Sequence, residues 1–399
     1  MLRRRHGFRA TFPRLAALLI VAAVVPRSAA GGDSPAPAVE LAGSLALPET
    51  AGPTGPKLTG LSGVAWLGED RYVAVLDNSD LVVVFRLAVT VTGAPEQISD
   101  LRMVTLAERH DYEDIAPCPP ALERRIAERR RARGDRVPAS VLLVCEEDTP
   151  AIRGIDPQTG DLLGIVPLPA ALTAVRPNRG LEALAVEPDG GCIWTATEEA
   201  VPADGPAAGE GRGTVVRIAR IPVPGAAGSP PAGQFAFMVD PPHAFARVIG
   251  GDAFAGLVAL VPLGGGRLLV LERSAAPGLP PFESRLSLVE TAAGRDVSGR
   301  QDGLTPPDSD LLAKLPLYRE PLGCNLEGLC LGPRLADGSR LLVGVADNGG
   351  LGTPTRLVTL RFREGPPRLE AALAAYAAAG AGVALLVLRL TSPSPCSTR

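Results

Sequence analysis

The sequence predicts an all-β fold, and three observations support this prediction. Glycine (45 residues) and proline (40) are abundant while aromatic residues make up only 4% of the chain, a composition that favours many short strands separated by turns. Short apolar segments occur in pairs along the chain, each pair interrupted by a turn. The pairs resemble one another, and such internal repetition is typical of repeat architectures. Together these features predict a β-propeller of five or six four-stranded blades.

Five segment pairs share one pattern: a short apolar strand, a turn, and a second apolar strand that ends in a carboxylate. They cover residues 61–78, 112–147, 181–199, 257–273 and 326–348. The turns at 188–191, 264–266 and 337–339 contain the Gly and Asp residues that supply positive φ angles in tight hairpins. Each pair is therefore predicted to form a β-hairpin.

Most hairpins continue into two further strand candidates, such as residues 151–156 and 162–168 in the second unit, which gives four strands per blade. The fifth unit has only one further candidate, residues 355–362. We expect residues 39–47 to supply its fourth strand, which closes the ring and removes exposed sheet edges. Five blades can be counted, and a sixth would have to lie in a poorly patterned region.

The longest irregular insertion, residues 119–138, lies in the turn of the second hairpin and is rich in Arg and Glu. It is predicted to form a short basic helix that projects from one face. Such charge runs usually serve solubility, and docking of an anion or a partner is the alternative.

The N-terminal segment is predicted to be a signal peptide covering residues 1–30. Basic residues precede an apolar run at 15–25, and small residues follow at 28–30. The apolar run is too short to span a bilayer of about 30 Å. We therefore expect an exported protein, periplasmic, extracellular or at the cell surface, whose propeller domain covers residues 31–365.

The C-terminal segment, residues 366–399, is predicted to be a linker followed by a candidate membrane anchor. Residues 371–388 are uncharged and mostly Ala, Gly, Leu and Val, and Arg389 follows them. This length suits an apolar helix that crosses a membrane, with the arginine at the cytoplasmic end. Because alanine contributes little to insertion, a surface helix or a disordered tail is the alternative.

Several classes of function lack support in the composition. The formal net charge is -3, from 40 basic and 43 acidic residues, so no nucleic-acid partner is expected. The six cysteines contain no C-x-x-C motif and match no small disulfide scaffold, and no pairing is predicted. Only His6, His110 and His243 occur, so no histidine metal site is expected. The chain also lacks a G-x-S-x-G elbow and a Walker phosphate loop.

Acidic residues recur at the start of the first strand and at the end of the second strand of the hairpins. Both positions should lie at one mouth of the propeller channel, because the second strand returns to the face where the first begins. Crowded carboxylates raise one another's pKa or recruit a cation, and all-oxygen sites favour calcium or magnesium over zinc. Calcium is the expected cofactor, and the candidate ligands are Glu113, Asp114, Glu146, Glu198, Asp347 and Asp77.

Two arginines accompany these acids at the same predicted face. Arg179 precedes the third hairpin, and Arg273 follows Glu272 in the fourth. They could bind a phosphate or carboxylate group of a substrate through paired hydrogen bonds, or they could neutralise the acids. A further alternative is that the acids bind backbone N–H groups of the neighbouring blade and have a structural role.

Residues 178–190, 268–273 and 325–338 resemble the phytase-like domain family, also called the esterase-like activity of phytase family. The similarity covers about residues 58–360. It implies an exported propeller-type domain rich in acidic residues, with a suggested phosphoester or ester hydrolase activity. The chain departs from the family pattern at Leu181-Glu182-Ala183, where Phe-Glu-Gly is usual, and at Ser62 and Val258, which replace the acid that opens the first strand.

The leading hypothesis is a metal-assisted hydrolase of small phosphate esters or related esters. Its predicted catalytic residues are Glu182, Glu327 and Glu272, and its predicted substrate-binding residues are Arg179 and Arg273. The alternatives are a non-catalytic extracellular propeller that binds a ligand or a protein, and a calcium lactonase-like propeller.

Overall fold

The computed structural model of the chain describes residues 36–51, 55–243, 253–276, 280–304, 310–322, 324–347 and 354–365. The predicted signal peptide (residues 1–30) and the predicted C-terminal apolar helix (residues 371–388) lie outside these residues. Within the described ranges, no helix is long and apolar enough to cross a membrane.

The described strands form five antiparallel sheets of four strands each. The first blade consists of β2 (Leu61–Trp66), β3 (Arg71–Leu76), β4 (Ser79–Val89) and β5 (Pro95–His110). The second consists of β6 (Tyr112–Pro117), β7 (Leu142–Glu146), β8 (Ala151–Ile155) and β9 (Leu162–Val166). The third consists of β10 (Leu181–Val186), β11 (Cys192–Thr197), β12 (Thr214–Pro222) and β13 (Gly233–Val239). The fourth consists of β14 (Phe254–Gly264), β15 (Arg267–Ala275), β16 (Phe282–Glu290) and β17 (Leu315–Glu320).

The fifth blade combines the two ends of the propeller domain. It consists of β18 (Asn325–Arg334), β19 (Arg340–Asp347), β20 (Arg356–Arg363) and β1 (Ala38–Ala46). The N-terminal strand β1 pairs antiparallel with β20, with Val39 opposite Phe362 and Leu45 opposite Leu357. This pairing confirms the predicted closure of the ring, and the described residues form five blades, the number that the repeats indicated.

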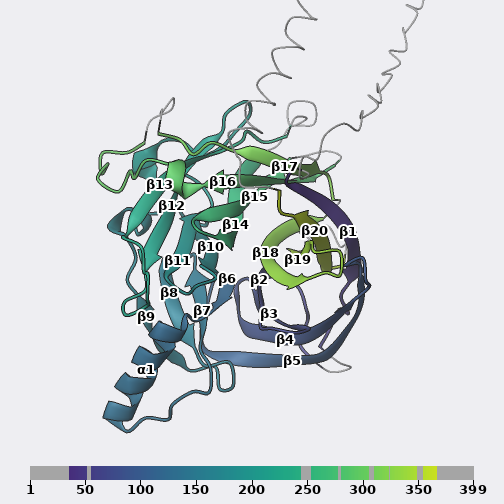
Figure 1. Cartoon of the computed structure of the whole chain (residues 1–399), viewed down its shortest axis with the longest axis vertical. Helices are drawn as coiled ribbons and strands as arrows, with labels where there is room; N and C mark the ends of the chain where they lie inside the picture. The colour runs from purple at the N-terminus through teal and green to yellow at the C-terminus, as the bar shows by residue number, and fades with distance from the viewer. Residues whose placement is uncertain are drawn as a thin grey trace, which may run out of the picture. The chain divides into compact units, whose positions relative to one another are not determined.

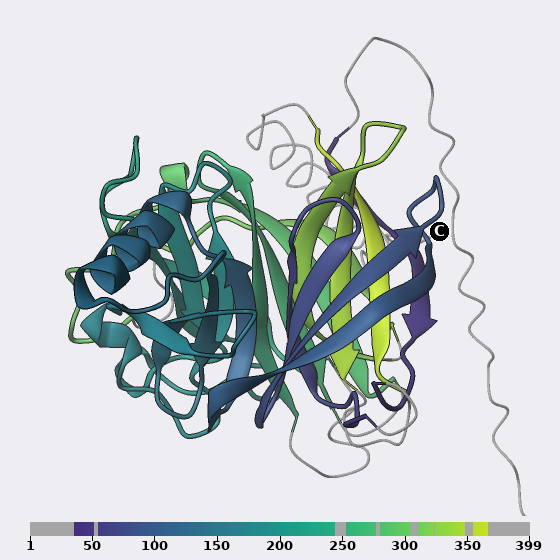
Figure 2. The ribbon, with the colours of Figure 1, turned by 90° about the horizontal axis from the view of Figure 1, so that it is seen from below.

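The innermost strands of the blades meet around the centre of the ring (Figure 1). They contact one another in the order β2, β6, β10, β14, β18, and β18 returns to β2. The contact between β18 and β2 is close, because a Cβ atom at Gly328 would lie only 2.3 Å from the carbonyl oxygen of Ser62. Figure 2 shows the ribbon from below, after a turn of 90° about the horizontal axis.

The apolar core lies between the blades and follows the two-residue alternation of β-strands. In β15, Leu268 and Val270 pack with Trp194 of the third blade. The intervening residues Leu269 and Leu271 pack with the fifth blade, which contributes Leu342 and Leu360 among others. The inner strands of the sheets are therefore buried on both faces, which explains why they appear in the sequence as nearly continuous apolar runs.

The insertion in the second hairpin forms α1 (Pro120–Arg133), as predicted. Proline at its first position fits the start of a helix, and Gly134, with φ 77°, ends it in the left-handed conformation. Three 3₁₀ helices complete the described elements: Ala170–Leu172, Pro202–Asp204 and Thr291–Ala293. The cysteines of the described part are all free: Cys118, Cys145, Cys192, Cys324 and Cys330.

Candidate functional site

A β-bulge interrupts the start of the innermost strand in every blade. In the second blade, pairing with β7 passes from Tyr112 to Asp114, which leaves Glu113 as the extra residue. A bulge leaves one residue unpaired and re-aims its side chain. The equivalent positions in the other blades are occupied by Ser62 (followed by Gly63), Glu182, Val258 and Glu327.

In each blade, one residue at the end of the second strand lies beside this bulge. In the third blade Leu181 pairs with Thr197 just before the bulge, so that Glu198 comes next to it. In the fourth blade Leu257 pairs with Glu272, so that Arg273 has the position equivalent to Glu198. The complete set is Asp77, Glu147, Glu198, Arg273 and Asp347. An arginine thus stands in the fourth blade where the others have an acid.

This pairing register places Glu272 and Glu146, two of the predicted site residues, away from the channel mouth. Successive side chains of a strand point to opposite faces, so Glu272 faces away from the side of β15 that carries Arg273. It accepts hydrogen bonds from Lys314 Nζ at 2.7 Å and from the backbone N–H of Asp240 at 2.6 Å. Glu146 likewise lies on the other side from Glu147 and accepts a hydrogen bond from Arg153 Nε. Neither Glu272 nor Glu146 belongs to the carboxylates of the channel mouth.

Arg273 is the buried cation of the channel mouth. Its guanidinium donates hydrogen bonds to Glu327 and Glu198. It also lies 3.8 Å from Glu182 Oε1. Its side chain is only 9% exposed. Arg273 therefore neutralises acids at the ends of three strands inside the ring.

Arg179 contacts the same acids from the more open side. Its Nη1 lies 2.9 Å from Glu198 Oε2, and its Nε lies 3.6 Å from Glu199 Oε1. The guanidinium of Arg179 stacks on Phe254 at 5.0 Å from the ring centroid, and that of Arg273 lies 5.4 Å from the same centroid. Both arginines therefore neutralise acids, and Arg179, at 27% exposure, remains partly open to solvent.

Two groups of carboxylates at the channel mouth have the spacing of metal ligands. One consists of Glu147, Glu182 and Glu198, and the other of Asp77, Asp111 and Glu113. Within each group the oxygen atoms lie within 4.8 Å of one another. All three residues of the first group are buried. The donors are oxygens only, which suits a hard cation such as Ca²⁺.

Burial and mutual repulsion perturb the acids of the channel mouth. Burial and the neighbouring Asp111 raise the pKa of Asp77 to about 8. Burial and Glu198 raise the pKa of Glu147 to about 7. Burial, followed by the charge of Glu113, holds the pKa of Glu182 well above its usual range. These carboxyls therefore favour either a bound proton or a cation at neutral pH.

Other acids of the ring connect one blade to the next. The two carboxylate oxygens of Asp114 accept hydrogen bonds from the backbone N–H groups of Ile115 and Leu184, each at 2.8 Å. Asp347 accepts a hydrogen bond from the backbone N–H of Gly60 at 3.0 Å. With both oxygens engaged in this way, Asp114 joins the second blade to the third, which is the structural role that the sequence left open.

Three participants in the site were not predicted from the sequence as catalytic, substrate-binding or metal-binding residues. Asp111 precedes β6 and accepts a hydrogen bond from the backbone N–H of Asn78 at 3.2 Å. Ser62, in the bulge of the first blade, donates a hydrogen bond to Glu113. The ring of Phe254 contacts both guanidiniums. Asp111 had a sequence signal, because it adjoins the acidic start of the second hairpin, and Ser62 was noted only as a replacement of the acid that opens the first strand.

The fold and the site define a class: a five-bladed β-propeller with buried carboxylates and two arginines at one channel mouth. Residues 56–350 match the model of the phytase-like family, described as esterase-like activity of phytase. This match covers most of the propeller, and the chain belongs to the phytase-like family.

Other comparisons add little to this assignment. No curated protein matches the chain. An endo-arabinase from Bacteroides thetaiotaomicron is similar over 81% of this chain and 99% of its own, with 10% identity and a TM-score of 0.39. The tail fiber of Staphylococcus aureus phage P68 is similar over 84% of this chain and 54% of its own, with 8% identity and a TM-score of 0.37. These scores are too low to support any conclusion about activity.

Proposed function

We propose that the protein is a metal-assisted hydrolase of small phosphate esters or related esters, with its active site at the channel mouth. The observation that carries this proposal is the buried group Glu147, Glu182 and Glu198, whose oxygens lie within 4.8 Å of one another. Arg179 adjoins this group through Glu198. The carboxylates of such a group can bind a cation, and the arginine beside them can bind an anionic substrate.

The donor chemistry fits calcium. Carboxylate oxygens are the preferred ligands of this ion, and the raised pKa of Glu147 and that of Glu182 indicate that negative charge in the group is incompletely balanced. Glu147, Glu182 and Glu198 would hold the ion. When bound, a divalent metal polarises an ester and lowers the pKa of a coordinated water.

The chain's own residues divide the remaining tasks. Arg179 is the partly exposed cation and would orient the anionic group of a substrate. Arg273, which is buried, fixes Glu198 and Glu327 in position. Burial raises the pKa of Glu327 to about 7 although Arg273 opposes this shift. A carboxyl that titrates near neutral pH can accept or donate a proton during catalysis, so Glu327 is the candidate general acid or base.

The binding alternative has one specific observation in its favour. Asp114 and Asp347 accept hydrogen bonds from backbone groups of the next blade. If every acid served in this way, the propeller would bind a ligand or a protein without catalysis. Glu182 has no such hydrogen bond among the described residues, and its nearest cation, Arg273, lies 3.8 Å away, so this residue distinguishes the two functions.

The deciding experiment is a calcium titration of the purified protein with two readouts, thermal stability and hydrolysis of a substrate panel. The panel contains a phosphomonoester, a phosphodiester, a carboxylester and a lactone. The proposal expects calcium-dependent turnover that is lost in Glu182→Gln. The matched control is Glu187→Gln, which changes another buried glutamate just beyond the far end of β10, where Glu187 accepts a hydrogen bond from Trp194 Nε1 at 2.6 Å.

The outcomes separate the alternatives. Stabilisation by calcium without turnover would support a binding propeller held by a metal. Turnover of the lactone alone would support the lactonase-like function. The absence of any response to calcium would refute the metal site at the channel mouth.

We also propose that the protein acts outside the cytoplasm, as the N-terminal sequence pattern suggests. The proposed partner is a small ester or phosphoester, and no nucleic acid is proposed. N-terminal sequencing of the mature protein tests export, because cleavage of residues 1–30 leaves Gly31 as the first residue.

A further inference from the structure

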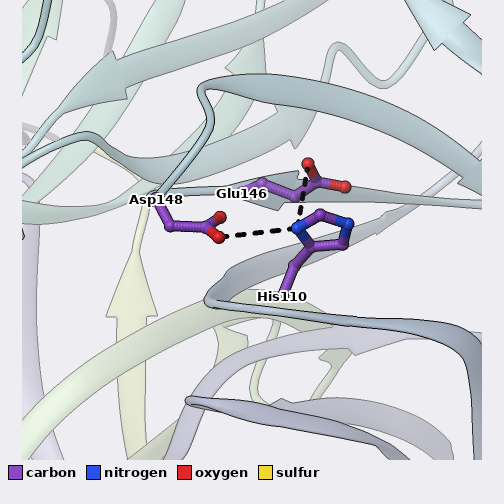
Figure 3. A group of neighbouring side chains, drawn as sticks. All are labelled: His110, Glu146 and Asp148. Atoms are coloured by element: carbon purple, nitrogen blue, oxygen red, sulfur yellow. Dashed lines mark ion pairs between the residues drawn. The ribbon is translucent and has the colours of Figure 1, made fainter.

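A second group of potential metal ligands lies apart from the central carboxylates (Figure 3). It consists of His110, Glu146 and Asp148. His110 is the last residue of β5 in the first blade, whereas Glu146 ends β7 in the second blade and Asp148 lies in the turn that follows. His110 Nδ1 is 3.8 Å from Glu146 Oε2 and 3.6 Å from Asp148 Oδ2. The group thus connects two blades.

Two atoms of this group are buried without a hydrogen-bond partner among the described residues: Glu146 Oε2 and His110 Nδ1. The Glu146 side chain is 0% exposed, and Arg153 Nε engages only its other oxygen, Oε1. Buried polar atoms in proteins are nearly always paired, so an unpaired one calls for a ligand, a water or an ion. Here the two unpaired atoms face each other, as the dashed line in Figure 3 indicates.

The other ring nitrogen of His110 also faces a carboxylate, because Nε2 lies 3.2 Å from Glu108 Oε2. In the tautomer that carries its proton on Nε2, Glu108 accepts this N–H and Nδ1 keeps a free lone pair, which is the usual arrangement for a metal-bound histidine. Nδ1 itself lies 3.6 and 3.8 Å from the carboxylate oxygens of Asp148 and Glu146, beyond hydrogen-bonding distance.

We propose that His110, Glu146 and Asp148 form a binding site for a divalent transition-metal ion, for which Zn²⁺ is the best fit. Ligand bonds of about 2.1 Å in a tetrahedral site separate ligand atoms by about 3.4 Å. The two separations from His110 Nδ1 exceed this value by a few tenths of an ångström, and all three ligand atoms lie within 4.8 Å of one another. Asp148 is 49% exposed, so the fourth position is open to water.

The charge around the site suits a divalent cation. Glu108, Glu146 and Asp148 supply three negative charges, and Arg153 supplies one positive charge. One divalent ion balances the remainder. The nitrogen donor separates this site from the all-oxygen groups of the channel mouth, which favour calcium. The proposal also departs from the sequence-based expectation that no histidine metal site is present.

Zinc binding by the purified full-length protein tests the proposal. The protein is stripped of metal, returned to a calcium-containing buffer that saturates the all-oxygen groups, and titrated with Zn²⁺ by calorimetry. We expect one equivalent of tightly bound zinc and a rise in the unfolding temperature, because the ion joins two blades. His110→Ala and Asp148→Asn should abolish this binding, and Glu108→Gln should weaken it by about 10- to 100-fold, the usual effect of losing a supporting hydrogen bond.

Two controls identify the site. Asp70→Asn removes a carboxylate that is 45% exposed in the first blade and pairs with Arg86, and it should leave zinc binding unchanged. Glu182→Gln should leave it unchanged as well, and this result would stand even if the channel mouth proved to have no catalytic activity.

Crystals of the zinc-loaded protein, measured at the zinc absorption edge, should give an anomalous peak between His110 and Asp148. Zinc binding that is equal in the wild type and in Asp148→Asn would overturn the proposal, as would a peak elsewhere. Asp148 lies in a half-exposed turn, so this variant remains informative if His110→Ala fails to fold.

Discussion

The substitution Glu327→Gln should remove part of the pH dependence of stability. Burial raises the pKa of Glu327 from an ordinary 4.5 to about 7, with Arg273 opposing and Asp347 adding to the shift. The folded protein therefore retains a proton that the unfolded chain loses between these two values. By linkage, the stability contributed by this carboxyl is fully present below about pH 4.5, falls as the pH rises, and is lost above about pH 7.

The size of this effect follows from the same two values. Their difference corresponds to about 3 kcal/mol of unfolding free energy, and little discount for solvent is needed because the side chain is only 12% exposed. Glutamine keeps an oxygen that can accept the hydrogen bonds from Arg273 and Asn325 but carries no titrating proton. As the pH rises from 4.5 to 8, the unfolding free energy of the variant should therefore increase by about 3 kcal/mol relative to that of the wild type.

Urea unfolding at a series of pH values, with a calcium chelator present, measures this difference. Glu187→Gln is the control. It removes a buried carboxylate at the end of the third blade that lies away from the channel mouth, and its effect on the same curves is measured in parallel. Parallel curves for Glu327→Gln and the wild type would refute the reasoning, because they would mean that Glu327 has the same pKa in the folded and unfolded states.

Three further substitutions or deletions test other parts of the structure. Arg273→Met should lower the unfolding free energy by about 3–5 kcal/mol, because it leaves Glu327 buried without its cation and leaves Glu198 with Arg179 alone, and urea unfolding at pH 8 measures the loss. Gly328→Ala should lower it by about 1–3 kcal/mol or more, because the added Cβ would lie 2.3 Å from the carbonyl oxygen of Ser62, and thermal unfolding measures this. Deletion of residues 36–47 should expose the edge of β20 and cause aggregation, detected by light scattering.

Each of these three predictions has a result that contradicts it. For Arg273→Met, unchanged stability at pH 8 would mean that the acids do not need this cation. For Gly328→Ala, the comparison is Gly209→Ala, where the nearest atom to the added Cβ lies 3.5 Å away; equal losses would exclude a specific clash in the ring. For the deletion, a soluble monomer of unchanged stability would show that β1 is dispensable.

The fold was predictable because each blade repeats the same local signals. Apolar segments of strand length are separated by turns rich in glycine and aspartate, such as residues 188–191, and these signals depend only on neighbouring residues. Even the pairing of β1 with β20 could be inferred, because the fifth unit lacked one strand. The basic helix α1 was predicted from its charged insertion and is present.

The candidate site was only partly predictable, because bulges shift the register by one residue. Glu272 and Arg273 are adjacent in sequence, and which of them faces the channel depends on the extra residue at Val258. A shift of one residue exchanges the two faces of a strand. The group around His110 depends on contacts between β5 and the turn after β7, which no local pattern specifies.

The pairing of β1 with β20 also has a consequence for the order in which the protein can be completed. Glu40 and its partner Arg363 are 323 residues apart in the chain. At ribosomal rates of about 5–20 residues per second, β1 is made roughly 15 to 65 s before the strand that it pairs with. During this interval the first segment of the domain has no partner, and the last segment to be synthesised supplies it. The ring therefore cannot close before translation has passed β20.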